Sequence, residues 1–259
     1  MQTFLYVPGH KPQYLDAAFG CNPDAIIVDA EDALPDGYRD IAIATLTKAL
    51  MMKQHTKVYL RIAASISVAA SMDNIDGFPV PDGYVLSKTE SIGQLNNLRM
   101  ALRCKQTDER DLEFIPLIET PIGVIHAPNI ASFPLTNHIF FGAMDYAAAT
   151  GNYYLKDAKL SLMARAWVAN AALAYGKTPI DTVLRYSDGK RAFSFIEESR
   201  SLGYQGCQCA WPLAVPLARG TYRMSAEEIA LQRKVAEKRN SSSEPTFIVN
   251  NTLHGPMAP

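Results

Sequence analysis

The chain has 259 residues, of which 48% are hydrophobic and 20% are charged, and its formal net charge is −1. This composition is typical of an ordinary globular protein with one large core or two domains, and it argues against a nucleic-acid-binding surface. The spacing of the four cysteines matches no zinc-binding pattern. We find no signal peptide and no apolar run near the length of a membrane span, so we expect a cytoplasmic protein with no membrane partner.

Short apolar runs rich in β-branched residues alternate along the chain with helix-like stretches. The predicted strands cover residues 4–7, 25–28, 57–60, 84–86, 113–118, 138–141, 180–184 and 206–210. The clearest predicted helices cover residues 36–52, 92–103, 157–175, 191–202 and 226–238, whereas residues 62–83 show no clear pattern. Buried strands that alternate with helices predict a parallel sheet with both faces covered, and eight such units favour a closed (β/α)₈ barrel.

The last part of the chain is predicted to lie outside the barrel. We assign residues 1–240 to the barrel and residues 241–259 to a C-terminal tail. Residues 240–245 are typical of a flexible linker, and residues 246–249 are strand-like. The tail is expected to pack on the barrel or on a neighbouring subunit.

Ionisable residues follow five consecutive predicted strands. They are Asp29, Glu31 and Asp32 after the second strand, Arg61 after the third, Lys88 and Glu90 after the fourth, Glu119 after the fifth and Asp145 shortly after the sixth. In a parallel barrel all strand C-termini open onto one face, where active sites of this fold lie. We therefore expect these side chains to converge, although polar loops alone explain one or two of them.

Glu119 and Asp145 are the best candidate metal ligands in this set. Two carboxylates with room for water and substrate oxygens suit Mg²⁺, whereas zinc prefers histidine or cysteine. The structural alternative is that Glu119 caps the following segment and that Asp145 is a helix N-cap.

Arg61 is the candidate clamp for a substrate carboxylate, because its planar fork can bond both oxygens. The alternative is a structural ion pair with Asp29 or Glu31. The crowded charges of Asp29, Glu31 and Asp32 need compensation by Arg61, Lys88 or the metal, and some of them are expected to orient the water molecules of the metal.

The loop after the first strand carries His10 and Lys11, which are candidates for contact with a phosphate or a thioester carrier. A solvated loop explains them equally well. Nucleotide-binding loops and a G-x-S-x-G nucleophile elbow are absent from the sequence.

Several motifs resemble the citrate lyase β-subunit-like branch of the HpcH/HpaI aldolase family. They are FLYVPGHKP, IIVDAEDAL, YLRIAA, YVLSKTES, PLIETPIGV, FFGAMDYAAATG, GYQGCQCAWPLAVPL and MSAEEIALQRKV. They stand in the order of the family, and the likeness spans about residues 4–249.

The resemblance implies a barrel, usually in a trimer, with Mg²⁺ on Glu119 and Asp145 and with Arg61 on the substrate. Lys88 and Glu90 would support the site. The family cleaves or forms thioesters such as citryl, citramalyl or malyl groups carried on coenzyme A or an acyl carrier protein.

Three features of the sequence depart from the family pattern. Gln2 and Thr3 replace an Arg-Ser pair that helps to bind the carrier, and Trp211 replaces the usual histidine before proline. The family commonly supplies an aspartate from the C-terminal segment of a neighbouring subunit as acid/base, but no aspartate follows Asp188 here. His254 is the titratable substitute that the tail offers.

Three hypotheses follow from these observations. The favoured one is a Mg²⁺-dependent carbon–carbon lyase acting on a 3-hydroxyacyl thioester. The second is an aldolase acting on free hydroxy-keto acids, which the missing arginine near the N-terminus favours. The third is a catalytically silent, metal-binding paralogue that serves as a scaffold or regulatory subunit.

Overall fold

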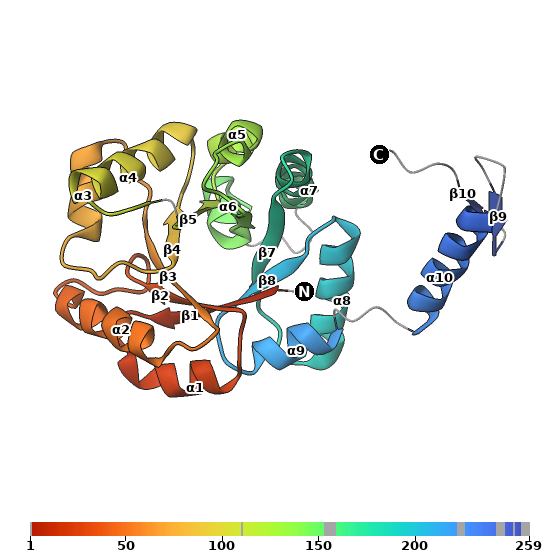
Figure 1. Cartoon of the computed structure of the whole chain (residues 1–259), viewed down its shortest axis with the longest axis horizontal. Coiled ribbons are helices and arrows are strands. Elements are labelled where there is room, and N and C mark those ends of the chain that lie inside the picture. The colour runs from red at the N-terminus through yellow and green to blue at the C-terminus, as the bar shows by residue number, and fades with distance from the viewer. Residues whose placement is uncertain are drawn as a thin grey trace. The chain divides into compact units, whose positions relative to one another are not determined.

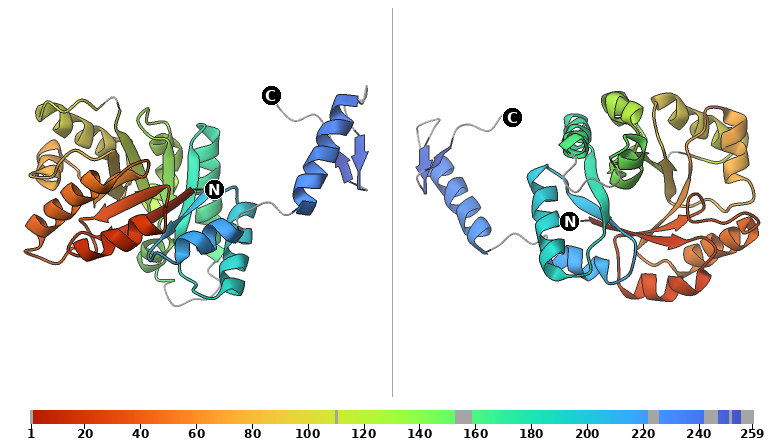
Figure 2. Two further views of the ribbon diagram at one scale, coloured as in Figure 1. Left: turned by 60° about the horizontal axis from the view of Figure 1, so that its bottom comes forward. Right: turned by 180° about the vertical axis from the view of Figure 1, so that it is seen from behind.

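The computed structural model describes residues 2–109, 111–152, 159–221, 226–241, 247–250 and 252–254. Eight strands form a closed barrel in which each strand is parallel to the next in chain order, and β8 pairs with β1 to complete the circle. The helices that follow the strands surround this barrel (Figures 1 and 2). The predicted (β/α)₈ fold is therefore confirmed.

The elements of the barrel alternate regularly. The strands are β1 (Gln2–Pro8), β2 (Ala25–Asp29), β3 (Lys57–Ala63), β4 (Gly83–Ser87), β5 (Glu113–Ile118), β6 (His138–Phe141), β7 (Thr178–Leu184) and β8 (Gly206–Cys209). The helices are a short 3₁₀ turn η1 (Pro12–Tyr14), then α1 (Leu15–Gly20), α2 (Arg39–Met52), α3 (Val68–Ile75), α4 (Ile92–Cys104), α5 (Pro121–Ala131), α6 (Ala143–Ala149), α7 (Lys159–Ala174), α8 (Gly189–Ser201) and α9 (Ala214–Thr221).

All eight predicted strands overlap observed strands, and the differences in bounds have local causes. Helix α2 begins three residues later than predicted, because a turn precedes it in which Gly37 has a φ of 81° and the Tyr38 amide donates to the Pro35 carbonyl. In the unassigned stretch 62–83, Ser67 caps α3 by accepting a hydrogen bond from the Ala70 amide. The first two residues of the helix predicted for 157–175 lie outside the described residues.

The interior of the barrel is filled by residues that alternate along each strand. The buried cluster there consists of Phe4, Ala25, Ile27, Tyr59, Val85, Ile115, Leu117, Phe140 and Ile180. Because strand side chains alternate with a period of two, the next residues of the same parity, Asp29, Arg61 and Glu119, also face inward at the carboxyl end. The strand pattern thus places these charges at one mouth of the barrel.

The remaining residues form a second compact unit. The chain divides into Met1–Thr221 and Tyr222–Pro259, so helix α10 (Ala226–Ser241) belongs to the second unit, whereas the boundary predicted from the sequence stood after residue 240. In this unit β9 (Phe247–Val249) and β10 (Thr252–His254) form an antiparallel hairpin, with Asn250 at a φ of 50° in the turn. Most of the predicted linker and the side chain of His254 lie outside the described residues. No helix of the described residues is long and apolar enough to span a membrane.

Substitution of Gly83 tests how closely strands β4 and β5 approach each other. A Cβ atom there would lie 2.9 Å from the main-chain carbon of Glu113 on β5, so Gly83→Ala is expected to lower the free energy of unfolding by about 1–3 kcal/mol. Urea denaturation measures this, with Gly20→Ala as the control because a Cβ at Gly20 meets no atom within 4 Å. Equal urea midpoints for the two variants would contradict this account of the strand contact.

Candidate active site

Arg61 lies at the centre of an ionic cluster at the carboxyl end of the barrel. In the register of β2 and β3 it is the neighbour of Asp29, and its Nη1 lies 3.0 Å from Asp29 Oδ2. Its Nη2 lies 2.8 Å from Glu31 Oε2 and 2.6 Å from Asp32 Oδ2. The ion pair that the sequence left open as an alternative role for Arg61 is therefore present, and the predicted convergence of this part of the site is confirmed.

Lys88 ties the same carboxylates to the metal-ligand candidate Glu119. Its Nζ lies 2.7 Å from Glu31 Oε1 and 3.1 Å from Asp32 Oδ1, and its main-chain amide donates to Glu119 Oε1 over 2.8 Å. The residue has a φ of 52°, a left-handed conformation that is unusual for a side chain of this size. Burial lowers the pKa of Lys88, but the hydrogen bonds and charges of Glu31 and Asp32 outweigh it and raise the pKa overall.

Glu119 is a buried carboxylate with an unfavourable electrostatic environment. Only 1% of the residue is exposed. Burial raises the pKa of Glu119 to about 8; the positive charges of Arg61 and Lys88 act against this rise, and the negative charge of Asp145 adds to it. A further positive charge at this position would therefore favour its negative form.

Asp145 stands in the first turn of α6, which begins directly beside Glu119. Gly142 precedes this helix, and a Cβ at Gly142 would lie 2.7 Å from Glu119 Cβ, so only glycine permits this approach. The Ala143 amide donates to the hydroxyl of Thr182 over 3.1 Å, and Thr182 lies at a register irregularity between β7 and β8. These contacts hold the start of the helix that carries Asp145.

The capping alternatives for both metal-ligand candidates are wrong. Thr120, not Glu119, is the N-cap of α5 and accepts from the Gly123 amide. Gly142 is the N-cap of α6, and Asp145 lies inside the helix. Both carboxylates are thus free of a capping role.

The donor set fits a hard cation that keeps part of its hydration shell. Among the described residues, no group of three or more histidine, cysteine, aspartate or glutamate side chains is arranged to hold a metal ion. Glu119 and Asp145 would supply two carboxylates, and water and substrate oxygens would complete the coordination. This is the pattern with which Mg²⁺ is usually bound.

The other predicted binding residues make contacts of their own. His10 packs edge-on against the ring of Tyr38 at 5.7 Å, and Lys11 Nζ lies 5.5 Å from the ring centre of Tyr14. The main chain of Glu90 donates to Gln94 Oε1 and contacts His126 Nδ1. The roles of His10, Lys11 and Glu90 in binding stay predictions.

Two polar residues inside the barrel were missed by the sequence reasoning. The Tyr6 hydroxyl donates to Gln208 Oε1 over 2.8 Å, and the Tyr6 ring centre lies 5.7 Å from Arg61 Cζ. The sequence signal for these residues is a polar side chain within a predicted apolar strand. This signal is weak, because the sequence does not show which face of the strand points inward.

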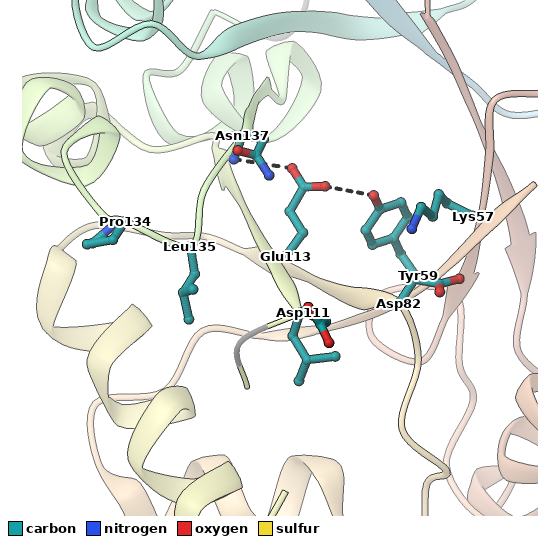
Figure 3. Close-up of a pocket in the computed structure, with 9 residues that line it drawn as sticks. Lys57, Tyr59, Asp82, Asp111, Glu113, Pro134, Leu135 and Asn137 are labelled. Carbon is teal, nitrogen blue, oxygen red and sulfur yellow. Dashed lines mark hydrogen bonds between the residues drawn. The ribbon is translucent and has the colours of Figure 1, made fainter. Parts of the chain in front are cut away.

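A polar cavity of about 290 Å³ lies at the opposite, amino-terminal end of the barrel (Figure 3). Its buried carboxylate, Glu113, accepts hydrogen bonds from the Tyr59 hydroxyl at 2.7 Å and from the His138 main chain at 3.0 Å, and it pairs with His138 Nδ1 at 2.6 Å. Although burial raises its pKa, the bonds to His138 and Tyr59 lower the pKa overall. The buried charge here is already satisfied, so the candidate active site is the carboxyl end.

We expect Mg²⁺ binding to depend on pH through Glu119. Below a pKa of about 8 the ion must displace a proton, so its dissociation constant should fall about tenfold per pH unit between pH 6 and 8 and then level off. Isothermal titration calorimetry measures this, and Glu119→Gln should show no such slope. A dissociation constant independent of pH would refute the assignment.

The same group should make the metal-free protein less stable as pH rises. The unfolded chain loses this proton near pH 4.5 and the folded chain near pH 8, so the contribution of Glu119 is largest below pH 4.5 and is lost between these values. Thermal unfolding with and without Mg²⁺ should show stabilisation by the ion that grows from pH 6 to pH 8.5.

Gly142→Ala should damage the metal site without unfolding the barrel. The new methyl group would displace the Glu119 carboxylate, so we expect Mg²⁺ affinity to fall by about tenfold or more. Gly189→Ala is the control, since a Cβ at Gly189 meets no atom within 4 Å. Unchanged affinity in a folded Gly142→Ala protein would exclude Glu119 as a ligand.

The chain is similar in sequence to known proteins. A citrate lyase subunit beta-like protein of Deinococcus radiodurans is 26% identical over 251 residues, which cover 94% of this chain and 87% of that protein. A (3S)-malyl-CoA thioesterase of Cereibacter sphaeroides is 27% identical over 236 residues, which cover 90% of this chain and 81% of that protein.

Solved structures share the fold. The protein CitE of Mycobacterium tuberculosis, in complex with magnesium, acetoacetate and coenzyme A, matches with a TM-score of 0.81 at 23% identity and covers 98% of this chain and 92% of its own. A citrate lyase beta subunit from M. tuberculosis, complexed with oxaloacetate and magnesium, has a TM-score of 0.71 at 23% identity. The match covers 86% of this chain and 96% of that chain. The family model for HpcH/HpaI aldolase/citrate lyase matches residues 2–212. This chain therefore belongs to the HpcH/HpaI aldolase/citrate lyase family, which includes lyases such as citrate lyase.

Proposed function

We propose that the chain is a Mg²⁺-dependent carbon–carbon lyase that cleaves or forms a 3-hydroxyacyl thioester such as citramalyl-, malyl- or citryl-coenzyme A. The products of cleavage are a keto acid and an acyl thioester. The observation that carries this proposal is the buried Glu119, which has both Asp145 and Arg61 as electrostatic neighbours at the mouth of the barrel. Relatives named for citrate lyase and for malyl-CoA support the substrate class.

Glu119 and Asp145 would hold the metal. The solved CitE structures contain magnesium together with acetoacetate or oxaloacetate, which supports both the ion and the keto acid. Bound at these carboxylates, Mg²⁺ would supply Lewis-acid polarisation of the substrate oxygen. The main-chain amide of Lys88 holds one oxygen of Glu119 and so orients the carboxylate.

Arg61 would bind the carboxylate of the keto acid. Its three carboxylate partners differ in exposure, with 6% of the Asp29 side chain, 14% of Glu31 and 46% of Asp32 accessible. The exposed Asp32 is therefore the partner that a substrate carboxylate displaces at least cost, because its charge regains water and keeps Lys88 as a partner. Asp29 then continues to hold the other end of the guanidinium.

Lys88 places a second positive charge at the mouth. Cleavage leaves negative charge on the thioester fragment, and preorganised cations and donors near that fragment stabilise the transition state. With its ammonium held by Glu31 and Asp32, Lys88 is fixed in position before substrate arrives. The trimer that the resemblance implies, and the use of an acyl carrier protein in place of coenzyme A, stay predictions.

Product analysis with Mg²⁺ tests the proposal. Cleavage of each of the three thioesters should give acetyl-coenzyme A and a keto acid. The keto acid should be glyoxylate from malyl-coenzyme A, pyruvate from citramalyl-coenzyme A and oxaloacetate from citryl-coenzyme A. Free malate and free coenzyme A would instead show thioester hydrolysis, the activity that the name of the Cereibacter relative describes. Turnover of free hydroxy-keto acids alone would favour the aldolase hypothesis.

Substitution of a residue that hydrogen-bonds to a metal ligand typically lowers activity about 10- to 100-fold. Glu119→Gln changes a proposed ligand itself, so it should lower kcat/KM by more than this. Glu197→Gln is the control, because Glu197 is an exposed carboxylate paired with Arg200 on α8. No turnover by the wild-type protein of any of the three thioesters would favour the catalytically silent paralogue.

A further inference from the structure

Gln208 joins three strands at the inner wall of the barrel mouth. The residue is 2% exposed, and its Nε2 donates to the main-chain carbonyls of Phe141 and Asp181, each over 3.0 Å. Because both amide hydrogens are committed to carbonyl groups, Oε1 is left as an acceptor. The orientation of this side chain is therefore determined by β6 and β7.

Tyr6 receives its orientation from Gln208. Its hydroxyl must act as the donor to Gln208 Oε1, since that oxygen has no hydrogen to give. Burial raises the pKa of Tyr6, in line with a neutral phenol that keeps this hydrogen. The hydrogen bond therefore holds the ring of Tyr6 at a defined place on the inner face of β1.

The ring of Tyr6 lies against Arg61. The distance from Arg61 Cζ to the ring centre is 5.7 Å, within the range of a cation–π interaction. The two terminal nitrogens of Arg61 are held by carboxylates, whereas its buried Nε has no hydrogen-bond partner among the described residues. The carboxylates thus hold the end of the guanidinium group, and Tyr6 is an aromatic neighbour that does not compete for its hydrogens.

We propose that Tyr6, anchored by Gln208, is a positioning residue that holds Arg61 ready for the carboxylate of the keto acid. This inference rests on the proposed function. When a substrate carboxylate displaces Asp32, Arg61 loses one of its fixed partners, but the contact with Tyr6 remains. A guanidinium that stays in place loses less conformational entropy on binding, so the affinity for the carboxylate rises.

Calorimetric titration of pyruvate and of oxaloacetate into the full chain with saturating Mg²⁺ tests the proposal. Tyr6→Leu, which removes the ring, should raise the dissociation constant of the keto acid about 2- to 30-fold, the range of a cation–π contact. Tyr6→Phe keeps the ring and should recover most of the affinity, and Gln208→Leu should resemble Tyr6→Phe. The dissociation constant of Mg²⁺ alone should not change in any of these variants.

Two controls separate positioning from general damage. Tyr59→Phe removes an interior hydroxyl whose partner, Glu113, lies at the other end of the barrel (Figure 3), so keto-acid affinity should not change. In an Arg61→Gln background, Tyr6→Leu should add no further loss, because the effect of Tyr6 passes through Arg61. In turnover, KM should rise while kcat stays within about twofold, since this contact is made equally before and during the reaction.

The outcomes distinguish the two proposals. If the wild-type protein binds the keto acid and Tyr6→Leu binds it equally well, Tyr6 is not a positioning residue and the proposed function stands. If Mg²⁺ affinity falls in parallel, or the loss persists in the Arg61→Gln background, the role is structural and the inference is overturned. If Tyr6→Leu does not fold, Gln208→Leu and Tyr6→Phe decide. A small loss of keto-acid affinity in these two variants supports the proposal, and no loss in either overturns it. If the wild-type protein binds neither keto acid, the proposed function fails and this inference fails with it.

Discussion

The buried carboxylate of Glu119 is the constraint on which the rest of the site depends. It accepts a hydrogen bond from the Lys88 main chain, and in the described part of the chain it has no direct ion pair. Burial of this negative charge is costly, and Arg61 and Lys88 offset the cost only in part, which is why the pKa is raised. A divalent cation shared with Asp145 would remove that cost, and the same cation would supply the proposed chemistry of the site.

A second buried glutamate, at the start of the same strand that Glu119 follows, has hydrogen-bond partners for both of its carboxylate oxygens. Glu113 begins β5 and faces the amino-terminal end of the barrel, where Tyr59 and His138 satisfy its oxygens and lower its pKa overall. Glu119 follows the other end of β5, and its pKa is raised. At one end of the barrel the buried carboxylate is satisfied by its neighbours, whereas at the other end burial of the carboxylate disfavours its charged form. This asymmetry agrees with the general division of such barrels into a stability face and a catalytic face.

Arg61 connects the ligand-requiring end to its surroundings. It neutralises part of the charge of Asp29, Glu31 and Asp32, so three acidic residues within four positions are tolerated. The proposed substrate binding is compatible with this ion pairing, since Asp32, the most exposed partner, is the one that a substrate carboxylate would displace. The contact with Tyr6 is made over the ring face and does not involve Asp32, so it would remain after that exchange.

The sequence by itself determined the strand order, the closed parallel barrel and the end at which the charged residues gather. Apolar runs and the residues that follow them are local patterns, and in a parallel barrel the end of every strand lies on one face. The tertiary structure alone decided the partners: the ion pairs of Arg61, the left-handed Lys88, the approach of Gly142 to Glu119 and the link from Gln208 to Tyr6. These contacts join residues on different strands, and they depend on register and barrel closure, which no local pattern contains.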